Sequence, residues 1–281
     1  MKNLAYYNGK ISEMEEMSIP MADRVSFFGD GVYDATYSRN YKIFTLDEHV
    51  DRFYRSAAEL LINIPISKDE LKALLSDLVL KMDTGENFVY FQATRGTDTV
   101  RAHAFDEKMT ANLWVNITPK NIVPVYDKIK LITLPDTRFF HCNIKTLNLI
   151  PSVMATNRAK SAGCDEAVFH RDGRVTECAH SNVHILKDGA LVTAPCDNLI
   201  LSGIARAHII KACRRLGIPV FEREYFLDDL FFADEIMISS AGSLCLSANE
   251  IDGKAVGGKA PELLKKIQDE VLREFMEETD L

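Results

Sequence analysis

Two side chains of opposite charge, Lys145 and Glu177, are candidates for covalent and acid–base chemistry. Lys145 lies in the segment 142–148, which contains no acidic residue and has apolar neighbours on both sides of the lysine. Apolar surroundings favour the neutral amine, which is the nucleophile that forms a Schiff base with a carbonyl compound. Glu177 lies in a polar stretch, 175–182, that follows a predicted hairpin. Taken alone, each residue could equally be an ordinary surface charge.

Two short segments could bind an anion. Gly203 stands at the start of a helix predicted from Ile204, and the first N–H groups of a helix have no acceptor within it, which makes this end positive. The residues 239–243, Ser-Ser-Ala-Gly-Ser, follow a predicted strand and offer further N–H and hydroxyl donors. An ordinary helix start and an ordinary turn are the alternatives, so a phosphate site depends on the context of these segments.

Three cationic or donor side chains of the first half could hold carboxylate or phosphate groups. Arg101 and His103 lie two positions apart in a loop, so in an extended chain they point the same way and could clamp a carboxylate. Arg52 lies beside the apolar stripe of a predicted helix, which is compatible with an inward orientation. The alternatives are a solvated loop end and, for Arg52, a salt bridge with Glu48 or Asp51.

The first half of the chain predicts strands around two helices. Alternation near residues 4–7 predicts a strand, and the run 28–33, Phe-Gly-Asp-Gly-Val-Tyr, leads into another extended segment. Apolar residues at helical spacing predict a helix over about 46–61, with a capping box that starts at Thr45, and a second helix that Ser67 caps in the same way. Residues 87–95 and 111–118 are rich in aromatic and β-branched residues and predict strands.

A stretch with two prolines, 118–125, separates the two halves. Because proline interrupts regular backbone hydrogen bonding, we expect a domain boundary here, between an N-terminal α/β domain of residues 1–120 and a C-terminal α/β domain of residues 121–281 that carries Lys145. The second half predicts further strands, helices and hairpins: strands near 129–134, 218–224 and 235–239, helices near 152–162, 204–216 and from Pro261 onward, and hairpins at 171–173 and 187–189. Interspersed helices and strands predict an α/β (α+β) fold with two domains.

Composition excludes several classes of protein. The chain has 281 residues, 47% of them hydrophobic and 26% charged, as in ordinary globular proteins. A net charge of −8 argues against a nucleic-acid partner. No stretch approaches the ~20 apolar residues of a membrane span and the start has no signal-peptide core, so we expect a cytoplasmic protein without a membrane partner. The six cysteines form no C-x-x-C pair, so no metal site is predicted.

Together these features resemble the class IV (fold type IV) aminotransferases that depend on pyridoxal 5′-phosphate, most closely the branch that acts on D-alanine and other D-amino acids. Any one feature is weak evidence, but the ordered set along nearly the whole chain is specific. The elements are the run 28–33, the helix with Arg52, Tyr90-Phe91-Gln92, Arg101-x-His103, Ile144 to Asn148, Thr176-Glu177 with Ser181-Asn182, Leu201-x-Gly203-Ile204 with Arg206, and Ser239-Ser240. The resemblance implies the two-domain fold type IV architecture.

The resemblance also implies a role for each candidate around the cofactor. Lys145 would bind pyridoxal phosphate covalently through a Schiff base and would move the α-proton of the substrate. Glu177 would keep the pyridine nitrogen protonated, so that the ring can accept electrons. Leu201 would pack on the face of the ring. The phosphate would be held by Arg52, by the helix start at Gly203, Ile204 and Ala205, and by Ser240 and Ala241.

A substrate site shared by two subunits is a further implication of the resemblance. Arg101 and His103 would trap the substrate α-carboxylate from the loop of a neighbouring subunit, with Tyr33 completing the trap and Tyr90 binding substrate beside it. A homodimer is therefore expected. The position of this carboxylate anchor would decide which enantiomer presents its α-hydrogen to Lys145.

Three positions depart from the family pattern. Ala205 and Ala241 stand where relatives often have threonines, so two hydroxyl donors to the phosphate would be missing and the cofactor would bind more weakly. His180 stands in a step that is serine-rich in relatives, and its ring could intrude on the surroundings of the cofactor. These departures leave the preferred substrate side chain open.

The expected activity is transfer of an amino group from a D-amino acid, such as D-alanine, to a 2-oxo acid, such as 2-oxoglutarate, by a ping-pong mechanism. Two alternatives keep the fold and cofactor. A 4-amino-4-deoxychorismate lyase would release pyruvate without an amino acceptor, and a branched-chain L-amino-acid aminotransferase would leave Arg101 and His103 without an obvious role. A non-catalytic relative that binds a small molecule is the alternative from a different class.

Overall fold

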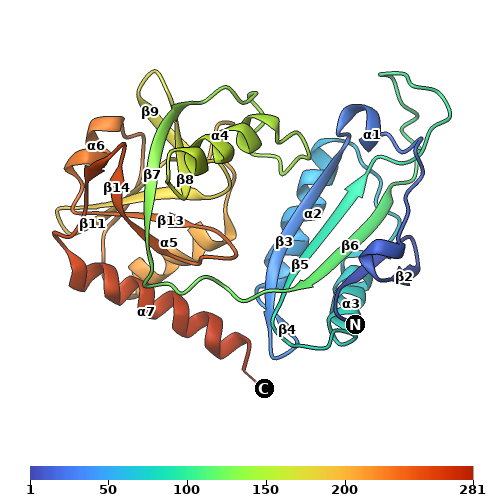
Figure 1. Ribbon diagram of the computed structural model, residues 1–281, viewed down its shortest axis with the longest axis horizontal. Coiled ribbons are helices and arrows are strands. Elements are labelled where there is room, and N and C mark those ends of the chain that lie inside the picture. The colour runs from blue at the N-terminus through green and yellow to red at the C-terminus, as the bar shows by residue number, and fades with distance from the viewer. Residues whose placement is uncertain (281) are drawn as a thin grey trace. The chain divides into compact units, whose positions relative to one another are not determined.

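A computed structural model describes residues 1–280, which form two compact units (Figure 1). The first unit comprises residues 1–121, the short segment 144–148 and the C-terminal residues from Met276. The second unit comprises residues 122–143 and 149–275. The segment with Lys145 thus groups with the N-terminal unit, whereas the sequence led us to expect this lysine in the C-terminal domain.

The first unit contains a six-stranded sheet and two long helices. Its elements are β1 (Leu4–Tyr7), β2 (Lys10–Ser12), a 3-10 turn (Met14–Glu16), α1 (Val25–Phe28), β3 (Gly31–Arg39), β4 (Lys42–Ile43), α2 (Leu46–Glu59), α3 (Lys68–Val79), β5 (Asn87–Thr94) and β6 (Asn112–Pro119). The strands are antiparallel, in the order β2-β1-β6-β5-β3-β4. Helices α2 and α3 cover one face of the sheet (Figure 1), and Phe53, Leu71 and Phe91 are among the fully buried side chains between them.

The predicted elements of this unit are largely confirmed. The predicted helix over 46–61 is α2, and the predicted strands 87–95 and 111–118 are β5 and β6. Ser67 begins α3 with the expected capping box, because its hydroxyl accepts from the backbone N–H of Glu70. The capping box predicted at Thr45 is wrong. Thr45 takes a left-handed backbone φ of 49°, and its N–H donates instead to the carboxylate of Glu278 at 2.8 Å.

Backbone hydrogen bonds attach the segment 144–148 to the start of β3. The N–H of Tyr33 donates to the carbonyl of Lys145 at 3.0 Å, and the N–H of Leu147 donates to the carbonyl of Gly31 at 3.1 Å. A Cβ on Gly31 would lie 2.6 Å from Leu147 Cδ1 and 2.7 Å from the carbonyl oxygen of Ala93, so only glycine allows this close approach. This strand-like pairing is why Lys145 belongs to the first unit.

The second unit contains a nine-stranded mixed sheet. Its elements are β7 (Lys128–Pro135), α4 (Ile150–Ser161), β8 (Glu166–Arg171), β9 (Arg174–Cys178), β10 (Asn182–Lys187), β11 (Ala190–Thr193), α5 (Ile204–Arg215), β12 (Val220–Glu222), α6 (Leu227–Phe232), β13 (Glu235–Ser239), β14 (Leu246–Ile251), β15 (Lys254–Ala255) and α7 (Pro261–Glu278). The strand order is β12-β11-β10-β13-β14-β7-β8-β9, with β15 paired to β14. Strand β7 is parallel to both of its neighbours, β14 and β8.

The predictions for this part of the chain hold in outline. The two Asp-Gly hairpins join β8 to β9 and β10 to β11, and both residues of each turn have positive φ, as a two-residue turn of this type requires. The helices predicted near 152–162, near 204–216 and from Pro261 are α4, α5 and α7. The mixture of helices and strands confirms the expected α/β (α+β) class. Among the described residues, none of the helices has the length and apolar character that crossing a bilayer requires.

Candidate active site

In the first unit, the amine of Lys145 faces an aromatic surface. Its Nζ lies 4.3 Å from the centroid of the Tyr33 ring, and this ring stacks on Tyr90 with centroids 5.4 Å apart. The hydroxyl of Tyr90 donates to Gln92 Oε1 at 2.6 Å. Burial raises the pKa of Tyr90 above its usual value, so the hydroxyl stays protonated at neutral pH. The structure thus brings together three of the residues that the sequence singled out, Lys145, Tyr33 and Tyr90.

Arg52 is buried on α2, and it forms an ion pair with a carboxylate that the sequence did not suggest. Its Nε and Nη2 donate to the two carboxylate oxygens of Asp34 on β3, at 2.8 and 2.7 Å. Asp34 itself is fully buried and is not among the candidates that the sequence indicates. The sequence does contain a sign that Asp34 is buried, because Asp34 lies two residues after Val32 and therefore on the same, inward-facing side of β3.

Asp34 also accepts from a second buried side chain, His49 of α2. His49 Nδ1 lies 2.7 Å from Asp34 Oδ1. Burial acts to raise the pKa of Asp34, but the charge of Arg52 and the hydrogen bonds from His49 and Arg52 outweigh it, so this pKa lies well below its usual range. A carboxylate can only accept, so Nδ1 of His49 carries the hydrogen. Burial lowers the pKa of His49 despite the opposing effect of Asp34, and Arg52 and Lys145 lower it further, so the ring is neutral at neutral pH.

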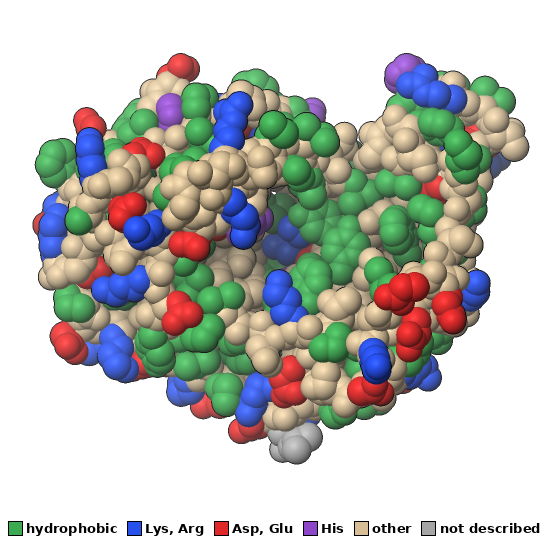
Figure 2. Space-filling view, viewed as in Figure 1, with side chains coloured by type: hydrophobic (Ala, Val, Ile, Leu, Met, Phe, Trp, Pro, Cys, Tyr) green, Lys and Arg blue, Asp and Glu red, His purple; other side chains and the backbone are tan. Residues whose placement is uncertain are grey.

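The loop between β5 and β6 presents Arg101 and His103 at the surface of the first unit. Figure 2 shows basic and histidine side chains gathered at the tip of this loop. The guanidinium carbon of Arg101 lies 5.0 Å from the centroid of the Phe28 ring, and the His103 ring lies 5.2 Å from the same centroid. The two side chains therefore share one aromatic support, and both are exposed to solvent.

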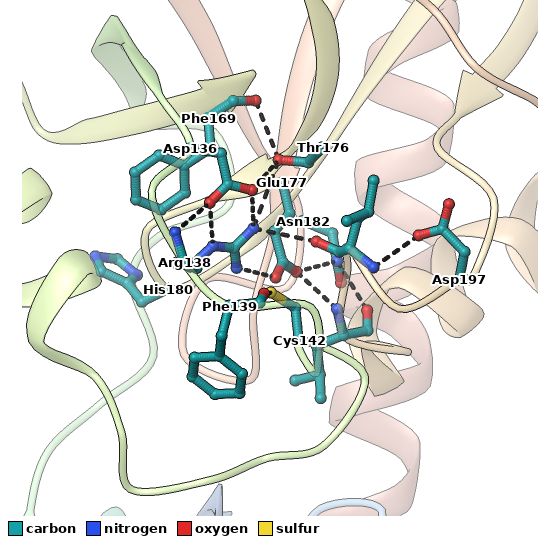
Figure 3. Close-up of polar contacts among 12 residues, drawn as sticks. Asp136, Arg138, Phe139, Cys142, Phe169, Thr176, Glu177, His180, Asn182 and Asp197 are labelled. Carbon is teal, nitrogen blue, oxygen red and sulfur yellow. Dashed lines mark hydrogen bonds and ion pairs between the residues drawn. The ribbon is translucent and has the colours of Figure 1, made fainter. Parts of the chain in front are cut away.

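In the second unit, both carboxylate oxygens of Glu177 are held in place (Figure 3). Arg138 Nη1 donates to Oε1, while Asn182 Nδ2 and the backbone N–H of Leu201 each donate to Oε2 at 3.0 Å. Glu177 is the next-to-last residue of β9 and Asn182 begins β10, so the tight turn between these strands brings the two side chains together. Only 6% of Glu177 is exposed, so it is a buried, ion-paired carboxylate rather than a surface charge.

Arg138 is itself fixed by a second carboxylate, that of Asp136 at the end of β7. Arg138 donates to both oxygens of Asp136 at 2.9 Å and to the carbonyl of Leu199 at 3.1 Å, and Arg171 Nε adds a contact to Asp136 at 3.1 Å. Burial would raise the pKa of Asp136, but the hydrogen bonds and charge of Arg138 bring it below the usual value. Arg138 is therefore rigidly aimed at Glu177. The sequence carries no motif around residues 136–138 that would have found this pair.

The turn before α5 is built around Gly203. Asn182 Nδ2 donates to the carbonyl of Leu201 at 3.0 Å, and a Cβ on Gly203 would lie 2.0 Å from Asn182 Oδ1. Helix α5 then begins at Ile204 without a side-chain cap, so the N–H groups of Ile204 and Ala205 have no acceptor within the helix. The second predicted anion segment is a turn in which Ser240 Oγ lies 2.7 Å from Ser243 Oγ, with Ala241 between them.

His180, which departs from the family pattern, lies beside a different carboxylate. Its Nδ1 is 3.3 Å from Glu166 Oε1, and its backbone N–H donates to the same oxygen at 2.9 Å. The ring is largely exposed, and Figure 3 shows it apart from the hydrogen-bonded group around Glu177. Glu166 is buried and also accepts from Ser181 Oγ at 2.8 Å. This arrangement ties the turn between β9 and β10 to β8.

The comparison with protein families identifies the class. The model described as "Amino-transferase class IV" matches residues 31–251, which include Lys145 and Glu177. The chain belongs to the class IV aminotransferase family, as its sequence features suggested. Aminotransferases of this class depend on pyridoxal 5′-phosphate, and the expected cofactor and enzyme class are confirmed.

Curated relatives and solved structures agree with this assignment. A D-alanine aminotransferase of Listeria monocytogenes serotype 4b (strain F2365) is 38% identical over 275 residues, 96% of this chain and 95% of the relative. The D-alanine aminotransferase of Bacillus licheniformis is 36% identical over 276 residues, 97% of each chain. The branched-chain amino acid aminotransferase of Escherichia coli superposes with a TM-score of 0.90 at 22% identity, over 100% of this chain and 97% of that chain, so the fold type IV architecture is confirmed.

Each unit has groups that fit pyridoxal phosphate. In the second unit, the paired carboxylate of Glu177 suits a protonated pyridine nitrogen, and the start of α5 after Gly203 has no side-chain cap, so its first backbone N–H groups suit a phosphate. In the first unit, Lys145 supplies an amine and Arg52 a guanidinium oriented by Asp34. The donor set is therefore chemically suited to an aldehyde that carries a pyridine ring and a phosphate.

Proposed function

We propose that this enzyme transfers the amino group of D-alanine, or of a related D-amino acid, to a 2-oxo acid such as 2-oxoglutarate by a ping-pong mechanism. The observation that carries the proposal is the pairing of Arg101 and His103 on the ring of Phe28, which presents two donors for a carboxylate. The similarity to curated D-alanine aminotransferases over nearly the whole chain supports the same substrate class.

Lys145 holds the cofactor covalently in this proposal and acts as the acid and base at the substrate α-carbon. Bound pyridoxal phosphate supplies an electron sink for the charge that develops at this carbon. Tyr33 supports the lysine amine through its ring. Glu177 would place its carboxylate at the pyridine nitrogen, and Arg138 and Asn182 orient this carboxylate.

The phosphate of the cofactor would be held by groups from both halves of the sequence. We assign Arg52 to it, together with the backbone donors of the α5 start and of the turn at Ser240. Leu201 would pack on the face of the ring. Because Ala205 and Ala241 bring no hydroxyl, the phosphate would depend on backbone N–H groups, Arg52 and Ser240, and we expect weaker cofactor binding than threonines would give.

The substrate carboxylate would be bound between two subunits of a homodimer. Arg101 and His103 would come from the neighbouring subunit, with Tyr33 and Tyr90 on the subunit that carries Lys145. An exposed apolar patch supports an association of copies: it consists of Leu149, Ile150, Val153 and Met154 at the start of α4. The six cysteines are all free, which supports a location in the reducing cytoplasm.

The test is the half-reaction of the purified enzyme with single amino acids. D-alanine should convert the bound cofactor to its pyridoxamine form, seen as a change in the absorbance of the cofactor, while L-isoleucine should not. Borohydride reduction of the holoenzyme, followed by peptide mapping, should place the label on Lys145. A response to L-isoleucine alone would reject the proposed stereochemistry, and release of pyruvate from aminodeoxychorismate without an amino acceptor would favour the lyase.

A further inference from the structure

Arg24 has no part in the function described so far, although it is a buried charge in the first unit. It lies in the turn that leads into α1, and only 3% of it is exposed. Its backbone N–H donates at 3.0 Å to the carbonyl of Gly96, which lies two residues after the end of β5. A buried guanidinium is costly unless its donors are paired, so the groups that it binds indicate what it holds in place.

The partners of Arg24 are the backbone of the loop that presents Arg101 and His103. Nη1 donates to the carbonyl of Ala102 at 2.8 Å, and Nη2 donates to the carbonyl of His103 at 3.2 Å. The planar fork of a guanidinium can bind two successive carbonyl groups at once, and a lysine ammonium cannot copy this geometry. Arg24 thus fixes the backbone between the two side chains assigned to the substrate carboxylate.

An ion pair with Asp30 fixes Arg24 in turn. Its Nε donates to Asp30 Oδ2 at 2.9 Å, and Arg95 Nε donates to both oxygens of the same carboxylate at 2.9 and 3.0 Å. Both guanidinium groups also lie near the ring of Phe105, Arg95 at 3.7 Å and Arg24 at 5.9 Å from the centroid. The loop is therefore fastened to the core of the unit at its backbone and at an aromatic side chain.

Aromatic contacts link this anchor to the side chains that it would position. The guanidinium of Arg24 lies 4.9 Å from the centroid of Phe28, the ring against which Arg101 and His103 also lie. Phe28 thus contacts the anchor and both presented side chains. At the base of the loop, the N–H of Asp98 donates to the carbonyl of Ala22 at 3.2 Å, but the backbone bonds described within residues 99–109 are short-range, such as Ala102 N–H to Val100 carbonyl. Little within this outer part of the loop would keep its shape without Arg24.

We propose that Arg24 is a positioning residue for the carboxylate trap, holding the loop so that Arg101 and His103 are oriented before the substrate binds. This inference rests on the proposed function, because it assigns Arg24 to the site that recognises the substrate carboxylate. A loop that is already ordered binds at a lower entropic cost than one that must be ordered on binding. Loss of Arg24 should therefore weaken substrate binding more than it slows proton transfer at Lys145, which lies on a separate segment.

Three variants of the holoenzyme test the proposal. Arg24→Met keeps the apolar part of the side chain and removes the guanidinium group. Arg24→Lys keeps a positive charge beside Asp30, so it still tests the proposal if Arg24→Met does not fold. Arg55→Met is the matched control, because Arg55 is an exposed arginine on α2 of the same unit. The readouts are KM and kcat, the dissociation constant of the cofactor, and amide hydrogen exchange of the peptide that covers residues 100–106.

For Arg24→Met we expect KM for D-alanine and for 2-oxoglutarate to rise about tenfold or more, with kcat within about threefold of the parent, because the loop loses its preorganisation. Exchange in the peptide 100–106 should be at least severalfold faster, cofactor affinity should be unchanged, Arg24→Lys should be intermediate, and Arg55→Met should match the parent. Unchanged exchange and KM would overturn the proposal, and so would a parallel loss of kcat and cofactor affinity. Failure of the proposed function would instead appear in the parent enzyme, as no reaction with D-alanine, and KM would then be measured with the amino donor that the parent accepts.

Discussion

Arg52 binds Asp34 through two hydrogen bonds, of 2.8 and 2.7 Å, between side chains that are both buried. Asp34 accepts from His49 as well, so one carboxylate orients two side chains of α2. An arginine held in this way cannot swing freely, so if Arg52 binds the cofactor phosphate as we propose, the protein sets its orientation before the cofactor binds. Asp34 is therefore important for Arg52 although the sequence alone did not indicate it.

Replacing Asp34 with asparagine should destabilise the first unit. The change Asp34→Asn removes the carboxylate charge that pairs with buried Arg52, and we expect the free energy of unfolding to fall by about 3 kcal/mol. Trp114, the single tryptophan of the chain, lies on β6 of the same unit, so its fluorescence during urea unfolding reports this loss. Asp51→Asn is the control, because Asp51 forms an exposed ion pair with Lys68, for which a change below about 1 kcal/mol is expected. Equal effects of the two substitutions would contradict this account.

His184 should make the second unit less stable in acid. It is fully buried between Thr193 and Ser239, at 2.9 and 2.8 Å, and burial together with Arg206 lowers its pKa from 6.5 to about 3. In the unfolded chain His184 binds a proton near pH 6.5, whereas in the folded chain it stays neutral down to a much lower pH. The contribution of His184 to the stability of the folded chain is therefore complete above pH 6.5 and is lost as the pH falls. Between about pH 7 and pH 4.5 the loss should approach 2 kcal/mol.

Urea unfolding at several pH values, followed by circular dichroism, measures the pH effect of His184. His184→Gln cannot take up this proton, so its stability should depend less on pH than that of the parent, whatever its stability at neutral pH. His141→Gln removes an exposed histidine of the same unit and should keep the pH dependence of the parent. The idea fails if both variants lose stability in acid as steeply as the parent does.

How much of this site the sequence predicts depends on whether a residue acts through its type and spacing or through a distant partner. Lys145, Glu177 and the pair Arg101 and His103 stand in local patterns that identify a family, and the predicted helices and strands follow from apolar periodicity. The partners of buried charges carry no such pattern. Asp34 contacts Arg52 because helix α2 packs against strand β3. Neither segment alone shows that the two will pack together in this register.

Local signals also fail where a tertiary contact outweighs them. Thr45 has the spacing of a capping box, but Glu278 from the far end of the chain takes its N–H, and the threonine adopts a left-handed backbone. Lys145 follows the proline-containing stretch in sequence, yet backbone hydrogen bonds with β3 group it with the first unit. In both cases the deciding group is about 100 residues or more away, so a window along the sequence does not contain it.

Alanine at position 203 should disturb Glu177 through Asn182. A Cβ there would lie 2.0 Å from Asn182 Oδ1, so Asn182 must move away from both Leu201 and Glu177. For Gly203→Ala we expect a loss of stability of about 2 kcal/mol from overpacking and a cofactor dissociation constant raised about tenfold. Thermal unfolding and a cofactor titration measure these effects.

A double-mutant cycle isolates the clash at Gly203. Asn182→Ala makes room for the new methyl group, so Gly203→Ala should cost clearly less in the Asn182→Ala background than in the parent. Strictly additive effects on stability and on cofactor affinity would mean that the two positions do not interact, and the steric explanation would then be abandoned.

Mixed dimers should show which subunit supplies the carboxylate trap. If Arg101 acts on the site of the neighbouring chain, a dimer of one Arg101→Met chain and one Lys145→Ala chain has one complete site, because the intact lysine meets the intact loop of its partner. We expect this mixed dimer, purified by two different affinity tags, to have the KM of the parent and about half its kcat per dimer. The reciprocal dimer, of a parent chain and a chain with both substitutions, pairs the only lysine with the altered loop. It should show a KM raised at least about tenfold, because the substrate carboxylate loses a charged hydrogen bond. The reverse pattern, with low KM only in the reciprocal dimer, would mean that each chain completes its own site.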